Sequence, residues 1–168
     1  RFEVYALGAA TQVDLMLQQC AQFQPRFAAM ASEPHGRALQ EKIKENGLPT
    51  QVLFAQGAME DIASSDEVDM VMAAIVGAAG LGPCLAAARS GKRLLLANKE
   101  ALVVGGEFFL RTVEQGGARL LPIDSEHSAI FQSLPEDPAT WQRRVHKIIL
   151  TASGGPFRTR DPATLRDV

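Results

Sequence analysis

The sequence is poor in cysteine and in two of the aromatic residues: its 168 residues include two cysteines, one tryptophan and one tyrosine. Cys20 and Cys84 are too few for a disulfide framework and lack the spacing of a metal site, so we expect a reducing compartment. A long apolar run is also missing, because glycines and Pro83 interrupt the most apolar stretch, residues 70–85. That stretch is too short to cross a bilayer. We find no secretory signal pattern and expect no membrane partner.

A basic excess is missing as well. Lys and Arg number 17 and Asp and Glu number 19, which gives a net charge of −2. This balance argues against a nucleic-acid partner. The apolar share of 46% and the charged share of 21% are ordinary for a globular protein. A G-x-G-x-x-G fingerprint is absent too, and the chain begins with Arg1 in a strand-like run, so we expect a fragment whose true start lies upstream.

Short apolar runs recur along the chain and predict strands. Several are apolar throughout rather than alternating, which is typical of strands covered on both faces in a parallel sheet. Their spacing fits βα units and predicts an α/β fold with a doubly wound, mainly parallel sheet. Ligands in such sheets bind beyond the carboxyl ends of the strands. The predicted strands are residues 3–7, 27–31, 51–55, 68–75, 93–97, 119–123 and 145–150.

Helical patterns separate most of these runs. Two segments carry stripes at i, i+3, i+4 and i+7, and a third carries two apolar residues one turn apart; each such stripe predicts a helix with one buried face. The stripes consist of Val13, Met16, Leu17 and Cys20; of Leu39 and Ile43; and of His127, Ile130, Phe131 and Leu134. Residues 135–138 form a predicted loop and a candidate domain edge.

Small or polar residues follow two of the strands. Ala10, Thr11 and Gln12 come after the first strand and open a helix, whose N-terminus favours anions. The simpler interpretation is a plain turn with Thr11 as the N-cap. Lys99 comes after the fifth strand, where it could hold a substrate hydroxyl or a phosphate. The alternative is a polar loop with an N-cap asparagine, but the position at a strand end modestly favours a functional role.

The most informative group follows the sixth strand. Asp124 and Glu126 stand two residues apart and can converge on one hard divalent cation, with Ser125 between them as a donor. The alternative is that Asp124 caps the next helix and Glu126 complements its dipole. His127 lies on the apolar stripe, which favours a structural role. Ser153 lies in a Ser-Gly-Gly turn that suits phosphate or is simply a tight turn.

Four segments resemble one enzyme family, the 1-deoxy-D-xylulose 5-phosphate reductoisomerases, in sequence, order and spacing. The D-S-E-H-x-A-I-F-Q-S-L motif is highly specific, and the resemblance spans essentially the whole chain. It implies a Rossmann-like NADPH-binding domain over residues 1–122, without its first strand and glycine-rich turn, and the start of an α+β catalytic domain over residues 123–168. The segments are residues 71–80 (VMAAIVGAAG), 95–101 (LLANKEA), 121–134 (LPIDSEHSAIFQSL) and 149–157 (ILTASGGPF).

The resemblance also implies a reaction. It is the metal-assisted rearrangement of 1-deoxy-D-xylulose 5-phosphate and its reduction by NADPH to 2-C-methyl-D-erythritol 4-phosphate, in non-mevalonate isoprenoid biosynthesis. The metal is Mn²⁺ or Mg²⁺, with Co²⁺ as an alternative. By resemblance, the metal ligands are Asp124 and Glu126. The substrate-binding residues are Lys99, Ser125, Glu126 and Ser153, and Lys99, Asp124 and Glu126 are catalytic. The cofactor-binding residues are Ala10, Thr11, Gln12, Asn98 and Glu100.

The sequence departs from the family pattern at residues 10–12, which usually read Gly-Lys-Asn or similar. Thr11 replaces a cation there, which weakens the argument for NADPH over NADH. The resemblance further implies a homodimer in the bacterial cytoplasm or the plastid stroma, and an inactive fragment that lacks the lid and a third metal carboxylate. Two other functions stay open: a metal-free nicotinamide dehydrogenase on the same fold, and a non-catalytic nucleotide-binding module.

Overall fold

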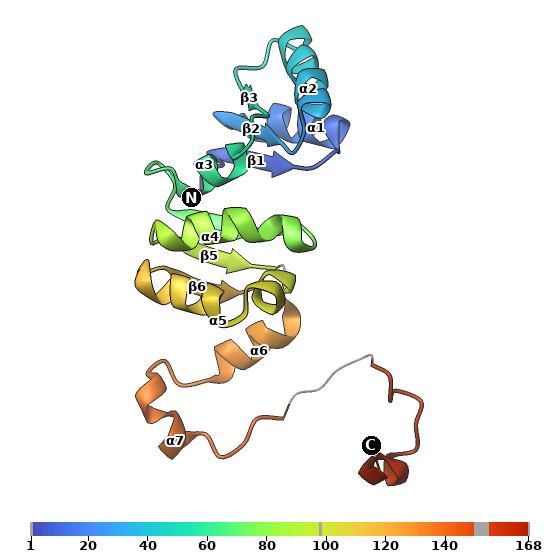
Figure 1. The fold of residues 1–168 in the computed structure, drawn as a ribbon, viewed down its shortest axis with the longest axis vertical. Coiled ribbons are helices and arrows are strands. Elements are labelled where there is room, and N and C mark those ends of the chain that lie inside the picture. Colours follow the sequence, from blue (N-terminus) through green and yellow to red (C-terminus); the bar gives the residue numbers. More distant parts are fainter. Residues whose placement is uncertain (1, 98, 150–154, 168) are drawn as a thin grey trace. The chain divides into compact units, whose positions relative to one another are not determined.

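The structure is a computed structural model that describes residues 2–97, 99–149 and 155–167. It is an α/β fold in which strands and helices alternate over most of the chain (Figure 1). The chain divides into two compact units, residues 1–121 and residues 122–168. The strands form two three-stranded sheets, with the order β1-β2-β3 in one and β4-β5-β6 in the other.

The first sheet is parallel and consists of β1 (Ala6–Ala9), β2 (Phe27–Met30) and β3 (Gln51–Leu53). Helices α1 (Val13–Phe23) and α2 (Glu33–Glu45) pack against it and against each other. The two apolar stripes predicted on these helices are confirmed, because their residues form part of the core against this sheet. The buried core residues are Met16, Cys20, Ala28, Met30, Leu39, Ile43 and Val52.

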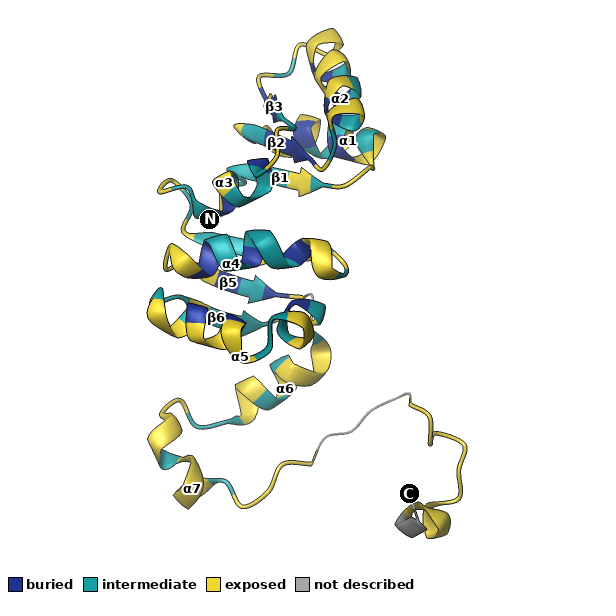
Figure 2. Ribbon diagram, viewed as in Figure 1, coloured by how far each residue is buried: buried dark blue, intermediate teal, exposed yellow. Residues whose placement is uncertain are grey.

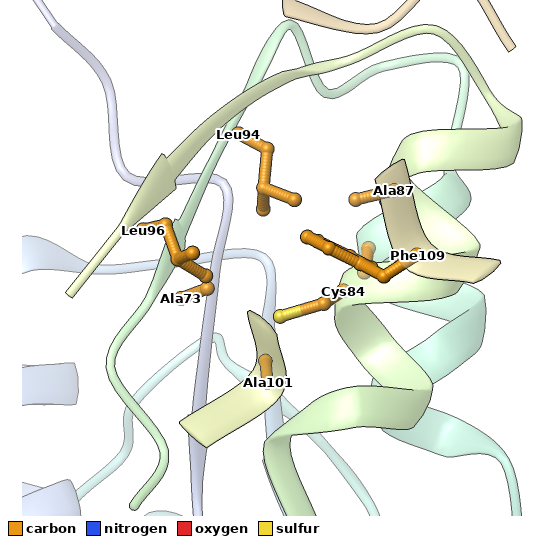
Figure 3. Close-up of a cluster of buried hydrophobic side chains, with 8 residues drawn as sticks. Ala73, Cys84, Ala87, Leu94, Leu96, Ala101 and Phe109 are labelled. Atoms are coloured by element: carbon orange, nitrogen blue, oxygen red, sulfur yellow. The ribbon is translucent and has the colours of Figure 1, made fainter. Parts of the chain in front are cut away.

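The second sheet consists of β4 (Met70–Ala73), β5 (Arg93–Leu96) and β6 (Arg119–Pro122), and β4 and β5 pair in parallel. Helix α3 (Ala58–Ser64) precedes it, and α4 (Leu81–Arg89) and α5 (Glu100–Gln115) follow β4 and β5. Helix α5 is kinked at Gly106, whose φ of +49° is strained for any residue with a Cβ. Figure 3 shows Phe109 of α5 directed toward Leu94 and Cys84 in the core of this sheet.

Phe109 is expected to be a main determinant of stability, because its side chain is fully buried in that core. Phe109→Ala should lower the free energy of unfolding by about 3–5 kcal/mol, since the surrounding helices and strands cannot fully close the cavity that the lost ring leaves. Phe108→Ala is the matched control, because Phe108 is its neighbour on α5 and is 52% exposed. The control should cost less than about 1 kcal/mol. Urea unfolding followed by circular dichroism compares the two; equal losses would contradict this packing.

Both cysteines lie in these cores, Cys20 against the first sheet and Cys84 against the second. Burial raises the pKa of the Cys84 thiol to about 11. Burial also raises the pKa of Cys20, and a hydrogen bond with Thr50 only partly offsets this. Both thiols therefore stay protonated near neutral pH and act as small apolar side chains.

The second unit contains β6's last residue, α6 (Ser125–Ser133) and α7 (Trp141–Arg144). None of its described residues is buried, as the exposed colour of α6 and α7 in Figure 2 shows. The predicted stripe of α6 is confirmed as helical, but it faces no core within the described part, and Phe131 is exposed. Ile130 and Leu134 of the same stripe are half-buried.

Six of the seven predicted strands are present, with ends that shift by a few residues. The first begins at Ala6 because its ladder with β2 starts at Ala6 and Phe27. The seventh prediction is wrong where it can be judged: residues 145–149 are not a strand. A strand needs a partner for its backbone groups, and the second unit offers none among its described residues. No helix in the described part of the chain is both long and apolar enough to cross a membrane.

Candidate functional site

The carboxyl end of β1 leads directly into α1 through exposed residues. Gln12, not Thr11, takes the N-cap position, with φ −80° and ψ 71°, and its side chain makes no capping hydrogen bond. The interpretation of Thr11 as the N-cap is therefore wrong. The carbonyl of Thr11 instead accepts the N–H of Val13 at 2.9 Å. Ala10, Thr11 and Gln12 are all exposed, so this turn presents backbone and a hydroxyl to solvent at the start of an 11-residue helix.

The carboxyl end of β5 leads into α5 in the same way. Ala97 still belongs to the sheet, because its N–H donates to the carbonyl of Ala73 at 3.0 Å. Lys99 is the N-cap residue of α5 and is exposed, while Glu100 is half-buried in the first turn. Asn98 lies outside the described residues. An exposed lysine at the carboxyl end of a parallel strand can reach a bound anion or hydroxyl.

Asp124 begins α6 and is held by two donors from one residue. Its Oδ1 accepts the backbone N–H of His127 at 3.1 Å and lies 2.7 Å from the imidazole Nδ1. The interpretation of Asp124 as a helix cap is thus confirmed. The same two contacts fix the side-chain orientation of Asp124, which a metal ligand also requires. Capping and metal binding are therefore compatible at this residue.

The charge state of Asp124 suits a cation. Desolvation raises the pKa of its carboxyl, but hydrogen bonds from the backbone and the imidazole of His127 lower it more, so the net pKa lies below its ordinary value. Asp124 is therefore ionised at neutral pH. Because the pKa of Asp124 is depressed in the folded state, its ionised carboxylate stabilises the fold at neutral pH. This contribution to the free energy of unfolding is lost as the pH falls through the folded pKa.

Glu126 lies in the first turn of α6, and its Oε2 accepts the hydroxyl of Ser125 at 3.0 Å. Both side chains are exposed. Two carboxylates and a hydroxyl therefore stand together at this helix start, a donor set that suits Mg²⁺ or Mn²⁺. The described residues contain no group of three or more His, Cys, Asp and Glu side chains placed to hold a metal. The donors fit the ion, but they fill only part of its coordination sphere.

The structure leaves part of the predicted site untested. Ser153 lies outside the described residues. Lys99 belongs to the first unit and Asp124 to the second, so their convergence stays a prediction. Sequence reasoning missed the role of His127, which is exposed and supports Asp124 rather than filling a core. The spacing of an N-cap acid three residues before the imidazole was the signal that could have revealed it.

A second contact of the same spacing was also missed. Ser32 is the N-cap residue of α2, and its Oγ lies 2.7 Å from the Nδ1 of His35. Unlike Asp124, Ser32 makes no side-chain hydrogen bond to the helix backbone. Its hydroxyl is therefore committed to the imidazole.

The sequence matches two family models. Residues 1–106 match 1-deoxy-D-xylulose 5-phosphate reductoisomerase, and residues 120–168 match the C-terminal domain of the same enzyme. A curated protein of that name from Cupriavidus taiwanensis is 53% identical over 168 residues, which are 100% of this chain and 43% of that protein. One from Paraburkholderia xenovorans is 54% identical, with 100% and 42% covered. The chain thus spans less than half the length of these relatives.

Solved structures give the same result. A crystal structure of DOX-P reductoisomerase in complex with NADPH, fosmidomycin and magnesium superimposes with a TM-score of 0.86 at 40% identity, over 100% of this chain and 43% of that chain. The reductoisomerase from Zymomonas mobilis in complex with NADPH gives a TM-score of 0.84 at 39% identity, over 97% of this chain and 42% of that one. The α/β, Rossmann-like fold class predicted from the sequence is confirmed.

Proposed function

Because the chain belongs to the 1-deoxy-D-xylulose 5-phosphate reductoisomerase family, we propose that the full-length protein performs that family's reaction. It rearranges 1-deoxy-D-xylulose 5-phosphate and reduces it with NADPH to 2-C-methyl-D-erythritol 4-phosphate. The observation that carries this proposal is the Asp124–Ser125–Glu126 group at the start of α6, because a hydride transfer alone has no use for two adjacent carboxylates. Relatives of that name, more than half identical over the whole chain, support it.

Residues 1–122, which are the first unit and Pro122, are proposed to bind NADPH. Their α/β arrangement provides strand ends that open into helices, and helix N-termini suit the phosphates of a dinucleotide. Exposed Ala10, Thr11 and Gln12 would receive the adenosine end. Asn98 and Glu100 would border the cofactor after β5. Solved relatives in complex with NADPH support this assignment.

Residues 123–168, which make up all of the second unit except Pro122, are proposed to begin the catalytic domain. Asp124 and Glu126 would hold Mg²⁺ or Mn²⁺, or alternatively Co²⁺, and the relatives solved with magnesium favour the first. When bound, the metal supplies Lewis-acid polarisation of substrate oxygens. Ser125 and Glu126 would contact the substrate, and Ser153 would lie near its phosphate. The ammonium of Lys99 would hold a substrate oxygen and offset its charge.

We further propose a homodimer in the bacterial cytoplasm as the working form. Its support is the bacterial origin of relatives such as those from Cupriavidus and Paraburkholderia, and the unburied apolar side chains Val103 and Val104 on α5 are consistent with a further contact surface. A plastid enzyme is the other setting in which this reaction is expected.

The competing function is a metal-free nicotinamide dehydrogenase on the same fold. Chelation distinguishes the two in the full-length protein, because only the reductoisomerase reaction needs a metal on Asp124 and Glu126. We expect EDTA to stop substrate-dependent NADPH oxidation and added Mg²⁺ to restore it. Turnover that persists in EDTA would favour the dehydrogenase and contradict the proposal.

Cofactor preference offers a test of position 11. Thr11→Lys in the full-length protein should tighten NADPH binding by about three- to tenfold, because a charge-assisted bond to phosphate is roughly twice as strong as a neutral one. NADH, which lacks the 2′-phosphate, should bind as before. Calorimetric titration measures both dissociation constants. Gln18→Lys, on the exposed side of α1, adds the same charge elsewhere and should change neither; equal tightening of both cofactors by Thr11→Lys would show that position 11 does not meet the 2′-phosphate.

A further inference from the structure

We propose that His35, held in place by Ser32, contacts the adenosine 2′-phosphate of NADPH and adds a donor to those that residues 10–12 offer. This inference rests on the proposed function, because it assumes that the first unit binds a nicotinamide dinucleotide. It adds a specificity-determining residue outside the residues assigned to the cofactor above. Three features of the molecule support the contact: the place of His35 after β2, the fixed orientation of its ring, and the charges around it.

His35 stands in the first turn of α2, which follows the strand paired with β1. Strands β1 and β2 run parallel with Ala9 opposite Met30, and the N–H of Ala31 donates to the carbonyl of Ala9 at 3.1 Å. Neighbouring strands lie about 4.8 Å apart. The chain segments that leave the two strands therefore leave the same edge side by side. One segment carries Thr11, and the other carries Ser32 and, one helical turn later, His35.

The imidazole is oriented before any ligand binds. Ser32 stands at the N-cap of α2 in an extended conformation (φ −143°, ψ 152°), and its hydroxyl contacts Nδ1 of His35 instead of capping the backbone. Both side chains are half-buried, so the ring has one shielded side. With Nδ1 engaged, Nε2 is the nitrogen left to meet a ligand. A histidine fixed through one nitrogen is a directed donor, and a hydrogen bond to a phosphate dianion is charge-assisted by its acceptor.

The acidic side chains nearby do not oppose an anion. Glu33, in the first turn of α2, pairs with Arg37 at 2.6 Å. Asp14, in the first turn of α1, pairs with Lys42 at 3.0 Å. The guanidinium of Arg37 also lies 5.8 Å from the centre of the Phe54 ring. Each carboxylate in these two first turns therefore has a cationic partner. Neither of them leaves an unpaired negative charge where α1 and α2 begin.

A 2′-phosphate is the part of NADPH that this edge would recognise. NADH carries a hydroxyl at the same place, so the imidazole would distinguish the two cofactors. Thr11 offers one hydroxyl donor to that phosphate, and the imidazole of His35 adds a second, directed donor. The pair Ser32–His35 thus explains how a chain with threonine at position 11 can still prefer the phosphorylated cofactor.

The test is calorimetric titration of the full-length protein with NADPH and, separately, with NADH, so that no turnover is needed. His35→Leu should weaken NADPH binding by about 10- to 100-fold, the worth of a hydrogen bond to a charged group, and leave NADH within twofold. Unchanged NADH binding also shows that the variant is folded. His35→Lys should keep the NADPH preference. His146→Leu is the matched control, because it removes an exposed imidazole of the second unit, and it should change neither constant.

Two results would overturn the inference. In the first, His35→Leu leaves NADPH binding unchanged; in the second, it weakens both cofactors equally. Either result would leave the proposed function intact provided that the wild-type protein binds NADPH. A wild-type protein that binds neither cofactor would instead contradict the proposed function itself.

Discussion

Asp124→Asn in the full-length protein is expected to reduce metal-dependent turnover by roughly a thousandfold or more. The substitution keeps the size of the side chain but removes the charge that a divalent cation requires. A metal that polarises substrate oxygens contributes several kcal/mol to catalysis, and about 4 kcal/mol corresponds to a thousandfold. Folding should survive, because asparagine is as good an N-cap as aspartate. Steady-state NADPH oxidation at rising Mg²⁺ concentrations measures the loss.

The matched control for this prediction is Asp137→Asn. Asp137 is also an N-cap, since its Oδ1 accepts the N–H of Ala139 at 3.0 Å, and it belongs to the same unit. It should keep full turnover, whereas Glu126→Gln should behave like Asp124→Asn. Full activity in Asp124→Asn, together with unchanged Mn²⁺ affinity, would refute its assignment as a metal ligand.

The 168-residue chain by itself is expected to be folded in its first unit but without catalytic turnover. Two buried cores stabilise residues 1–121. The second unit has no buried residue in its described part, so it contributes no core of its own. With Asp124 and Glu126 as its only assigned carboxylates, a bound Mg²⁺ would keep most of its waters and bind weakly. The chain also covers only 43% of a relative such as the one from Cupriavidus taiwanensis.

The measurement is NADPH absorbance in the presence of 1-deoxy-D-xylulose 5-phosphate and Mn²⁺, with the full-length protein beside the 168-residue chain. Circular dichroism shows whether the shorter chain has folded. We expect a helical spectrum and no detectable oxidation. A rate within a few orders of magnitude of the full-length protein would show that these residues carry all the essential groups.

Most of the fold could be predicted from the sequence, because its strands and helices show clear local patterns of apolar residues. Runs that are apolar throughout marked strands such as β2 and β5, and apolar stripes marked helices such as α1 and α2. The prediction was wrong at residues 145–149 because Ile148 and Ile149 are apolar enough for a strand but have no partner strand among the described residues. Apolarity permits a strand, whereas only pairing makes one.

The candidate site was predictable in its residue types but not in its contacts. The carboxylates Asp124 and Glu126 stood out because acidic residues followed an apolar strand. The imidazole of His127 was assigned to an apolar stripe because of its spacing along the helix. Spacing does not show which side chain is held by a hydrogen bond on the exposed side of that helix. The contact between Ser32 and His35 was missed for the same reason. Such pairs depend on rotamers at a helix start, and sequence periodicity carries no information about rotamers.

Identification of the product tests the central claim most directly. The full-length protein, supplied with 1-deoxy-D-xylulose 5-phosphate, NADPH and Mg²⁺, should form 2-C-methyl-D-erythritol 4-phosphate, whose branched carbon skeleton is recognised by carbon-13 NMR. One NADPH should be oxidised for each product formed. Recovery of unchanged substrate, or of a reduced sugar phosphate that keeps the linear skeleton, would contradict the assignment of this chain to a metal-dependent reductoisomerase.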